Sequence, residues 1–452
     1  MKFLNWKIWL GLSLIALAMK ISSGRNNMSF VYRKSSRHLA FVLALICLAV
    51  PLLQGCMASQ VRHPLPESLL DQAQVDDLPG IRVWGDNPID LEQSFIKSFQ
   101  EEKDANYGKL EAEANYLALS GGGGDGAFGA GFLCGWTEAG TRPKFKLVTG
   151  ISTGALIAPF AFLGPEYDAK LKEAYTMVSD KDIYKVPSKL KLLLNLGRIE
   201  AVASTEPLAE LLKRLIDDQV IQEIAAEHKK GRRLLVGTTQ LDAQRLVIWN
   251  MGAIAASGHP DAPQLFRQVL RAAASIPVAF NPVYIKVKAG GQEYDEMHVD
   301  GGVRAEVMLY LYEEALKLFT ARAKLRGLAP GLTPKLYIIR NAQVSPEYES
   351  VKPHIMDIGT RAINSLTKSQ GVGDLYRIYV LARQDEIEYN LAFIPGDFHP
   401  ERTSEFDTTY MNLEFDLAHD MARNGYKWHK SPPGFEPAST QEPTRPDKGA
   451  GK

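Results

Sequence analysis

The chain has 452 residues, of which 45% are hydrophobic and 23% are charged. It can therefore bury one large core or two ordinary ones, and its composition excludes a fibrous or disordered protein. The 52 Lys and Arg residues balance the 52 Asp and Glu residues, which excludes a global charge that would attract nucleic acid or an anionic membrane surface. Any contact with lipid must then come from local features.

The amino-terminal residues have the pattern of a secretory signal. Basic residues between Arg33 and His38 precede an apolar run, residues 39–53, and small residues follow at its end. This pattern predicts a cleaved signal peptide over residues 28–55. An uncleaved membrane anchor is the alternative, although about 15 apolar residues are few for a membrane span. Residues 1–27 carry an apolar stretch of their own and are either an over-extended start or a redundant leader.

The end of this signal, Leu53-Gln54-Gly55-Cys56, resembles a bacterial lipobox. The resemblance implies that Cys56 becomes lipidated after cleavage, and Met57 in the next position implies sorting to the outer membrane. Gln54 stands where the motif usually has a small residue. We therefore expect a protein of the bacterial cell envelope, with Cys56 holding the body at a membrane surface, on the periplasmic side of the outer membrane.

The cysteines give no information on the redox compartment. Cys47 lies inside the apolar run and Cys56 directly after it, so Cys134 is the one cysteine in the body of the protein. No disulfide can form within that body.

The mature chain divides into segments of different composition. Residues 56–113 are polar and contain several prolines and a charged run, which predicts a tether and a helical lead-in. Residues 114–345 have the periodic apolar pattern of a domain core, and residues 346–430 form an α+β extension. Residues 431–452 are rich in Pro, Gly, Ser and Lys, and we expect them to be disordered.

Segments of strand and helix character alternate in the core and the extension. Strands are expected at residues 116–120, 145–149, 234–238, 246–249, 283–287, 335–340, 376–381 and 386–393, and helices at 128–138, 153–163, 264–274, around 306–318 and at 411–424. The order at the start is strand, loop, helix, strand, turn, helix. It predicts an α/β fold of three layers, with a mainly parallel central sheet and helices on both faces.

Ser152 lies in a G-x-S-x-G motif, Gly150 to Gly154, between the second of these strands and the helix that follows. In this motif the serine sits at the apex of a sharp turn, where a substrate can reach its hydroxyl group. The two glycines are needed because strand and helix backbones approach closely there. The pattern is common by composition alone, and its position between a strand and a helix is what favours a nucleophile.

A glycine-rich loop, Gly121 to Gly126, joins the first strand to the first helix. Unpaired backbone N–H groups in such a loop can stabilise the oxyanion of a tetrahedral intermediate. A phosphate-binding loop and a simple hinge are the alternatives. The sequence that follows lacks the G-K-[ST] of a P-loop, and no clear acidic ribose partner follows a second strand.

Four blocks resemble those of the patatin-like phospholipases in order and approximate spacing: Ser120–Gly131, Gly150–Ala155, Ala274–Pro277 and Asp300–Gly302. The resemblance covers about half the chain, residues 115–340. It implies a Ser–Asp dyad, with Ser152 as the nucleophile and Asp300 as the general base. It also implies the following oxyanion-hole and motif glycines: Gly122, Gly123 and Gly124 for the hole, and Gly121, Gly126, Gly150, Gly154, Gly301 and Gly302 for the motifs. Without the family, the Asp300-Gly-Gly sequence would indicate only a turn.

Asp125 departs from the family pattern, which usually has Arg or Lys at this place in the loop. A carboxylate there does not attract a phosphate head group, and it would oppose a developing oxyanion if it pointed inward. The departure puts phospholipid specificity in doubt more than ester hydrolysis.

Other side chains are assigned to structure and not to chemistry. His298 would share a strand face with Asp300, while His354, His399 and His419 lie in no recognisable motif. Residues 185–196 form either a membrane-facing lid or an ordinary amphipathic helix. No metal-ligand spacing occurs, and we expect neither a metal nor a cofactor.

The sequence therefore predicts a serine acyl-ester hydrolase of phospholipase A or lysophospholipase type, acting on lipid or lysolipid from membranes through an acyl-enzyme. The alternative is a non-catalytic envelope lipoprotein that uses the same fold as a binding or scaffolding surface. Nucleic acid is not expected as a partner. Head group, acyl length and oligomeric state stay open.

Overall fold

The computed structural model describes residues 62–435, except 76–77, 88, 112, 188–199 and 310–333. The leader, the signal peptide, Cys56 and residues 436–452 of the tail lie outside the described residues, as do residues 188–196 of the stretch considered as a lid. The folded body begins at His63. Over the residues described, no helix is both long and apolar enough to cross a membrane.

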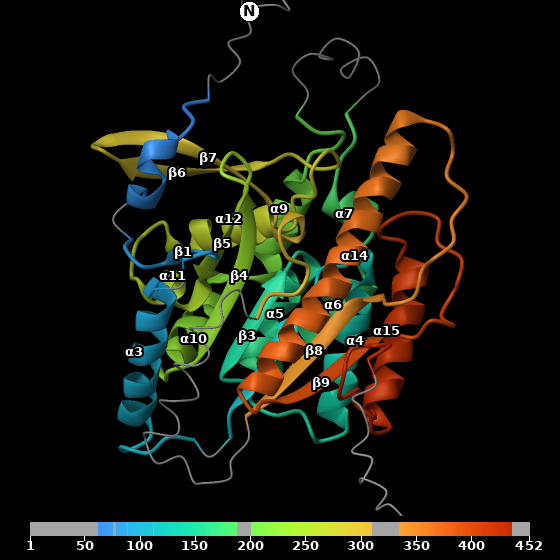
Figure 1. Cartoon of the computed structure of the whole chain (residues 1–452), viewed down its shortest axis with the longest axis horizontal. Coiled ribbons are helices and arrows are strands. Elements are labelled where there is room, and N and C mark those ends of the chain that lie inside the picture. Colours follow the sequence, from blue (N-terminus) through green and yellow to red (C-terminus); the bar gives the residue numbers. More distant parts are fainter. Residues whose placement is uncertain are drawn as a thin grey trace, which may run out of the picture. The chain divides into compact units, whose positions relative to one another are not determined.

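One sheet organises the body, and within the described residues it contains nine strands (Figure 1). They are β1 (Arg82–Trp84), β2 (Asn115–Leu119), β3 (Leu147–Ile151), β4 (Arg233–Gln240), β5 (Arg245–Asn250), β6 (Val283–Ala289), β7 (Gln292–Asp300), β8 (Lys335–Gln343) and β9 (Glu388–Ile394). The order is β1-β5-β4-β3-β2-β8-β9, and β7 pairs with both β4 and β6. The five strands from β4 to β9 in this order are parallel, whereas β1, β5, β6 and β7 pair antiparallel.

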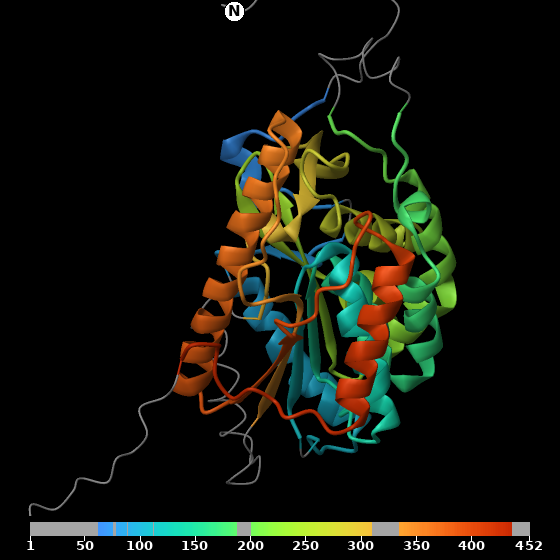
Figure 2. The same ribbon diagram turned by 90° about the vertical axis from the view of Figure 1, so that its right-hand side faces the viewer.

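Helices cover both faces of the sheet. They are α3 (Ile89–Ala105), α4 (Gly126–Glu138), α5 (Thr153–Leu163), α6 (Asp168–Thr176), α7 (Asp180–Ile183), α9 (Glu206–Leu215), α10 (Asp218–Lys229), α11 (Met251–Ala256), α12 (Ala262–Ala273), α14 (Ile355–Gln384) and α15 (Thr408–Arg423). Figure 2 shows α14 and α15 on opposite sides of the sheet. The expected three-layer α/β fold with a mainly parallel sheet is therefore confirmed.

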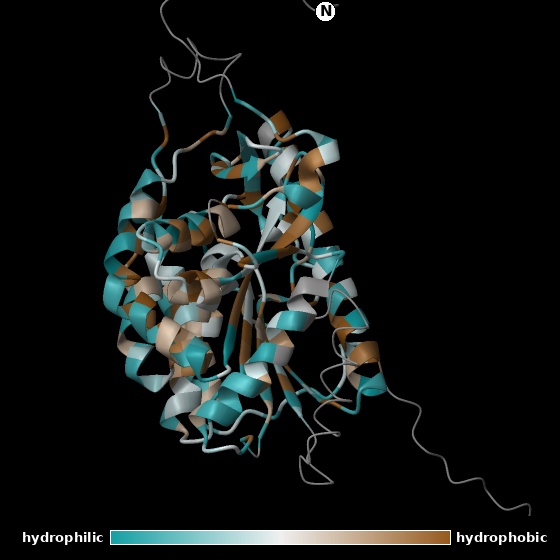
Figure 3. Ribbon diagram, turned by 90° about the vertical axis from the view of Figure 1, so that its left-hand side faces the viewer, coloured by the Kyte–Doolittle hydropathy of each residue, from teal (hydrophilic) through white to brown (hydrophobic). Residues whose placement is uncertain are grey.

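The central strands are apolar on both faces, as expected for parallel strands covered by two helical layers. In β2, Leu117 and Leu119 point into the core shared with α4, α5 and α12. Tyr116 and Ala118 point into the second core, shared with α14. Figure 3 shows this pattern as brown residues on the strands, with more hydrophilic residues on the outer helices.

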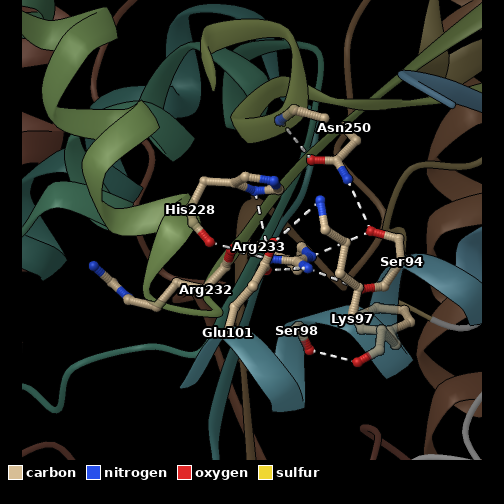
Figure 4. Close-up of polar contacts among 10 residues, drawn as sticks. Ser94, Lys97, Ser98, Glu101, His228, Arg232, Arg233 and Asn250 are labelled. Atoms are coloured by element: carbon tan, nitrogen blue, oxygen red, sulfur yellow. Dashed lines mark hydrogen bonds and ion pairs between the residues drawn. The ribbon is translucent and has the colours of Figure 1, made fainter. Parts of the chain in front are cut away.

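A buried arginine at the start of β4 fastens α3 to the sheet (Figure 4). Arg233 donates through Nη2 to the carbonyl of Ser94 (2.8 Å) and to the carboxylate of Glu101 (2.7 Å). Its Nη1 also donates to the carbonyl of His228 in α10 (3.3 Å). Because a buried guanidinium needs several acceptors, these contacts fix the position of α3 beside β4.

The part of the chain after β8 packs directly on the earlier elements. Strand β9 extends the sheet beside β8, and α15 lies along α4. A Cβ at Gly131 of α4 would lie 2.1 Å from the carbonyl oxygen of Phe415, and one at Gly135 would lie 2.1 Å from that of His419. The two helices approach closely only because these positions are glycine.

One of the expected strands is wrong. Residues 376–381 are not a strand but part of α14. Their aromatic and β-branched composition suggested a strand, yet the buried residues Leu375, Ile378, Tyr379 and Ala382 recur at the spacing of a helix.

The helix expected from residue 306 does not begin there, since residues 306–309 are irregular. The N–H groups of Glu306 and Val307 instead donate to the carboxylate of Asp374 in α14 (2.8 and 3.1 Å). The rest of that expected helix, residues 310–318, lies outside the described residues.

Candidate active site

Ser152 occupies the sharp turn between β3 and α5. Its φ of 52° and ψ of −126° are unusual for a residue with a side chain and store backbone strain. A Cβ at Gly150 would lie 2.4 Å from the carbonyl oxygen of Gly154, and a Cβ at Gly154 would lie 2.5 Å from that of Leu119. The turn thus requires both glycines, and it places the serine at the amino end of α5.

Asp300, the last residue of β7, lies beside Ser152. The Ser152 hydroxyl donates to Oδ2 of Asp300 at 2.6 Å, and the Gly302 N–H donates to Oδ1 at 2.7 Å. Gly301 packs against β4, since a Cβ there would lie 2.6 Å from the carbonyl oxygen of Gly237. The carboxylate is therefore held by two donors, one of which is the candidate nucleophile.

The pKa of Asp300 is suited to a general base. Burial raises the pKa of its carboxyl group to about 6, although the hydrogen bonds from Ser152 and Gly302 oppose the rise. Asp300 is therefore mostly ionised near neutral pH, and it accepts a proton more readily than an ordinary aspartate.

The block at Ala274–Pro277 also reaches this site. The N–H of Asp300 donates to the carbonyl of Ser275 at 2.9 Å, and the Ser275 hydroxyl donates to the carbonyl of Arg271 in α12 (2.9 Å). This block positions the end of β7, and so the Asp300 side chain.

The glycine loop lies between the end of β2 and the start of α4, against the Ser152 turn. A Cβ at Gly126 would lie 2.2 Å from Oγ1 of Thr153, and one at Gly121 would lie 3.2 Å from Cβ of Ser152. Gly122 has a φ of 157° and packs on Asn341, whose carbonyl oxygen a Cβ would approach to 2.0 Å. The loop therefore lies between β8 and the Ser152 turn.

The donors of the loop differ in their partners. The N–H groups of Gly122 and Gly123 donate no hydrogen bond within the described part of the chain. The N–H of Gly124, in contrast, donates to Oε1 of Glu405 at 3.3 Å. Gly122 and Gly123 therefore have the freer donors for an oxyanion, and Gly124 is already engaged.

Asp125 forms an ion pair with Arg402, which lies just before α15. The Nη1 atom of Arg402 donates to Oδ1 of Asp125 at 2.7 Å. Burial raises the pKa of Asp125 to about 7, and the Arg402 guanidinium opposes this rise. The carboxylate that departs from the family pattern is therefore compensated by a cation from a distant part of the chain.

An apolar cavity opens beside Ser152. Its lining consists of Gly123, Ser152, Thr153, Leu156, Ile183, Leu208, Ala274, Ile276, Phe280 and Phe406. Nearly all of these side chains are hydrocarbon, so the cavity suits an alkyl or acyl group better than a polar one.

A second buried carboxyl group, Glu306, lies next to Ser152 and Asp300 and was not identified from the sequence. A Cβ at Gly121 would lie 2.7 Å from its Oε2 atom, and a Cβ at Gly302 would lie 2.6 Å from its Oε1 atom. Burial and the charge of Asp300 raise the pKa of Glu306 to about 8, against the effect of Arg340. Glu306 is therefore mostly neutral at pH 7. No motif marks it, because its neighbours come from other segments.

The histidines lie apart from the dyad. The His298 ring is buried between Oγ1 of Thr238 (2.9 Å) and the carboxylate of Glu296 (3.1 Å), and burial lowers its pKa. His419 pairs with Glu138 at 3.0 Å on the outside of α4 and α15, and His354 precedes α14. Of the histidines that the structure describes, none hydrogen-bonds to Ser152 or Asp300. No group of three potential metal ligands occurs among the described residues either.

One family model matches the part of the chain that contains Ser152 and Asp300. The family model described as patatin-like phospholipase matches residues 117–310, a range that includes both Ser152 and Asp300. No curated protein matches the chain. The crystal structure of VipD from Legionella pneumophila is similar at a TM-score of 0.29 and 12% identity, over 70% of this chain and 68% of that one. The family match indicates a lipid acyl hydrolase in general.

Proposed function

We propose that this protein, whose residues 117–310 form a domain of the patatin-like phospholipase family, is a serine acyl-ester hydrolase with a Ser152–Asp300 dyad. The observation that carries the proposal is the 2.6 Å hydrogen bond from the Ser152 hydroxyl to the Asp300 carboxylate. It joins a nucleophile on a strained turn to a base whose pKa is about 6. The substrate class is a membrane-derived lipid or lysolipid, and the apolar cavity beside Ser152 supports an acyl chain as the bound group.

In the first half of the reaction, Oγ of Ser152 attacks the ester carbonyl carbon while Oδ2 of Asp300 takes the hydroxyl proton. The N–H groups of Gly122 and Gly123 donate to the oxyanion of the tetrahedral intermediate. When the intermediate collapses, Asp300 returns the proton to the leaving alcohol and an acyl-enzyme remains on Ser152. In the second half, Asp300 takes a proton from water while the water oxygen attacks the acyl carbon. The second tetrahedral intermediate then collapses, the bond between the acyl carbon and Oγ breaks, and Asp300 returns the proton to Oγ, which releases the fatty acid and restores the serine.

The test is hydrolysis of a p-nitrophenyl acyl ester by purified mature protein and by Ser152→Ala. The wild type should turn over and the variant should not, while both keep the same unfolding temperature. Labelling with a fluorophosphonate probe should occur on Ser152 of the folded wild type. Hydrolysis that persists in the variant would refute the assignment of the nucleophile. A folded wild type that takes no label would favour a binding or scaffolding protein.

We also propose that Cys56 carries a lipid anchor that keeps the enzyme at the outer membrane, facing the periplasm. The support is the sequence of residues 28–56, and an anchor of this kind would hold the active site at its lipid substrate. Cys56→Ala should release the chain from the membrane fraction or block its processing. Unchanged lipidation in that variant would rule out the proposed site.

A further inference from the structure

We propose that Arg402 is a positioning residue for the proposed hydrolysis, acting through Asp125 to hold the glycine loop in the geometry that receives the oxyanion. The inference rests on the proposed function. It assigns a role in the reaction to the segment between β9 and α15, which lies outside the matched residues 117–310.

A closed set of contacts joins Arg402 to the loop. Its Nη1 atom bonds to Asp125 at 2.7 Å, and its Nη2 atom lies 3.2 Å from Oε1 of Glu405. That same Oε1 atom accepts the N–H of Gly124 at 3.3 Å. Arg402 thus reaches two successive loop residues, one directly and one through Glu405, and a planar guanidinium suits such a two-sided contact.

The approach is possible because the loop lacks side chains. A Cβ at Gly124 would lie 2.2 Å from the carbonyl oxygen of Glu405 and 2.8 Å from Nη2 of Arg402, and a Cβ at Gly123 would lie 2.1 Å from Oε1 of Glu405. The glycines therefore allow close contact on two sides of the loop, with the Ser152 turn on one side and with the Arg402 segment on the other.

The segment itself is firmly attached. Arg402 lies over the ring of Tyr410 at 4.9 Å, and its Nε atom donates to the carbonyl of Ser404 at 3.0 Å. The N–H of Phe406 donates to Asp180 at 3.1 Å, and Phe406 also lines the cavity beside Ser152. Helix α15 follows, packed along α4. Because the Arg402 guanidinium is itself held in place, it can hold the glycine loop in one position.

Loss of Arg402 would act through the position of the loop donors. A neutral ester would bind as before, but the loop would no longer be held in the geometry that receives the oxyanion. Loss of Arg402 should therefore affect the transition state more than the bound substrate, which separates kcat from KM.

The experiment measures kcat and KM for ester hydrolysis with Arg402→Gln, Asp125→Asn and the double variant. We expect Arg402→Gln to lower kcat about 10–100-fold, because a displacement of about 1 Å costs about that much, while KM changes less than about threefold. If Arg402 acts through Asp125, the double variant should be no slower than the slower single variant. Arg402→Lys, which keeps the charge, should recover at least about fivefold over Arg402→Gln.

Arg267→Gln is the matched control, because Arg267 also pairs with an aspartate, Asp218, and its side chain is 19% exposed against 25% for Arg402. It should keep the wild-type kcat. The inference is overturned if Arg402→Gln keeps kcat within about threefold of the wild type, if the effects of the single variants multiply, or if Arg267→Gln loses as much activity. If Arg402→Gln does not fold, Asp125→Asn and Arg402→Lys test the inference instead. The inference then requires that each variant lowers kcat while KM changes less than about threefold. A wild type without Ser152-dependent hydrolysis would instead refute the proposed function.

Discussion

Replacement of Asp300 by asparagine should remove the proposed general base while leaving its supporting contact in place. The amide oxygen can still accept the N–H of Gly302, which lies 2.7 Å from Oδ1. The amide nitrogen would then face Oγ of Ser152, where Oδ2 now accepts its proton at 2.6 Å. An amide does not take up a proton near neutral pH, so the serine would lose its general base without losing its position.

The expected loss follows from what a general base contributes, about 10²–10⁴ in rate. This corresponds to about 2.7–5.4 kcal/mol of transition-state stabilisation. KM should change little, since the ester does not need the Asp300 charge in order to bind. The oxyanion donors of Gly122 and Gly123 remain, so activity should stay above the uncatalysed rate.

The assay compares kcat of the wild type and of Asp300→Asn on a p-nitrophenyl acyl ester. The concentration of protein that can react at Ser152 is determined in both by fluorophosphonate labelling over long times. Thermal unfolding of both proteins checks that the fold is retained. A folded Asp300→Asn variant that keeps more than about a tenth of the wild-type kcat would refute the reasoning, because the proton would then pass to another group.

The ionisation of Asp300 and of Glu306 and the close packing of α4 on α15 can each be tested. Because burial raises the pKa of Asp300 to about 6 and only the ionised form accepts a proton, kcat/KM should fall as pH drops through about 6; a profile that stays flat to about pH 4.5 would contradict this role. Glu306, with a pKa of about 8, should lower kcat of the wild type when it ionises above that pH. Glu306→Gln should match the wild type at pH 7 and lack this alkaline loss in the same pH series. Gly131→Ala should lower the free energy of unfolding by about 1–3 kcal/mol, because its Cβ would meet the Phe415 backbone at 2.1 Å; Gly359→Ala, with open space around it, should instead gain up to about 1 kcal/mol in denaturant unfolding.

The turn at Ser152 could be predicted because its geometry restricts the residues locally. A Cβ at Gly150 would lie 2.4 Å from a backbone oxygen and a Cβ at Gly154 would lie 2.5 Å from another, so the requirement for glycine is visible in the sequence itself. The apolar strands that flank the loop and the turn are buried on both sides, which makes them recognisable without knowledge of their neighbours.

Other parts could not be predicted because they depend on contacts between distant segments. Residues 376–381 look like a strand, and their helical burial appears only when the preceding residues pack with them on the sheet. Asp125 and Arg402 are 277 residues apart, and no local pattern connects them. The sequence therefore identified Asp125 as a departure but could not indicate what compensates it.

The charge balance around Ser152 explains why Asp300 is ionised in the proposed reaction while the charges of Glu306 and Asp125 are neutralised. In the proposed reaction the site starts with one negative charge, on Asp300, and after proton transfer it has one negative charge, on the oxyanion. The total is unchanged, so the donors of the glycine loop need only accommodate a charge that moves a short distance. An additional carboxylate would oppose that movement. Glu306 avoids this because burial keeps it protonated at neutral pH. Asp125 avoids it because burial raises its pKa to about 7 and its ionised form is paired with Arg402, 2.7 Å away. The two groups that sequence reasoning missed or questioned are thus neutralised by different means, and Glu306→Gln and Arg402→Gln should separate them: the first leaves kcat at pH 7 intact, and the second does not.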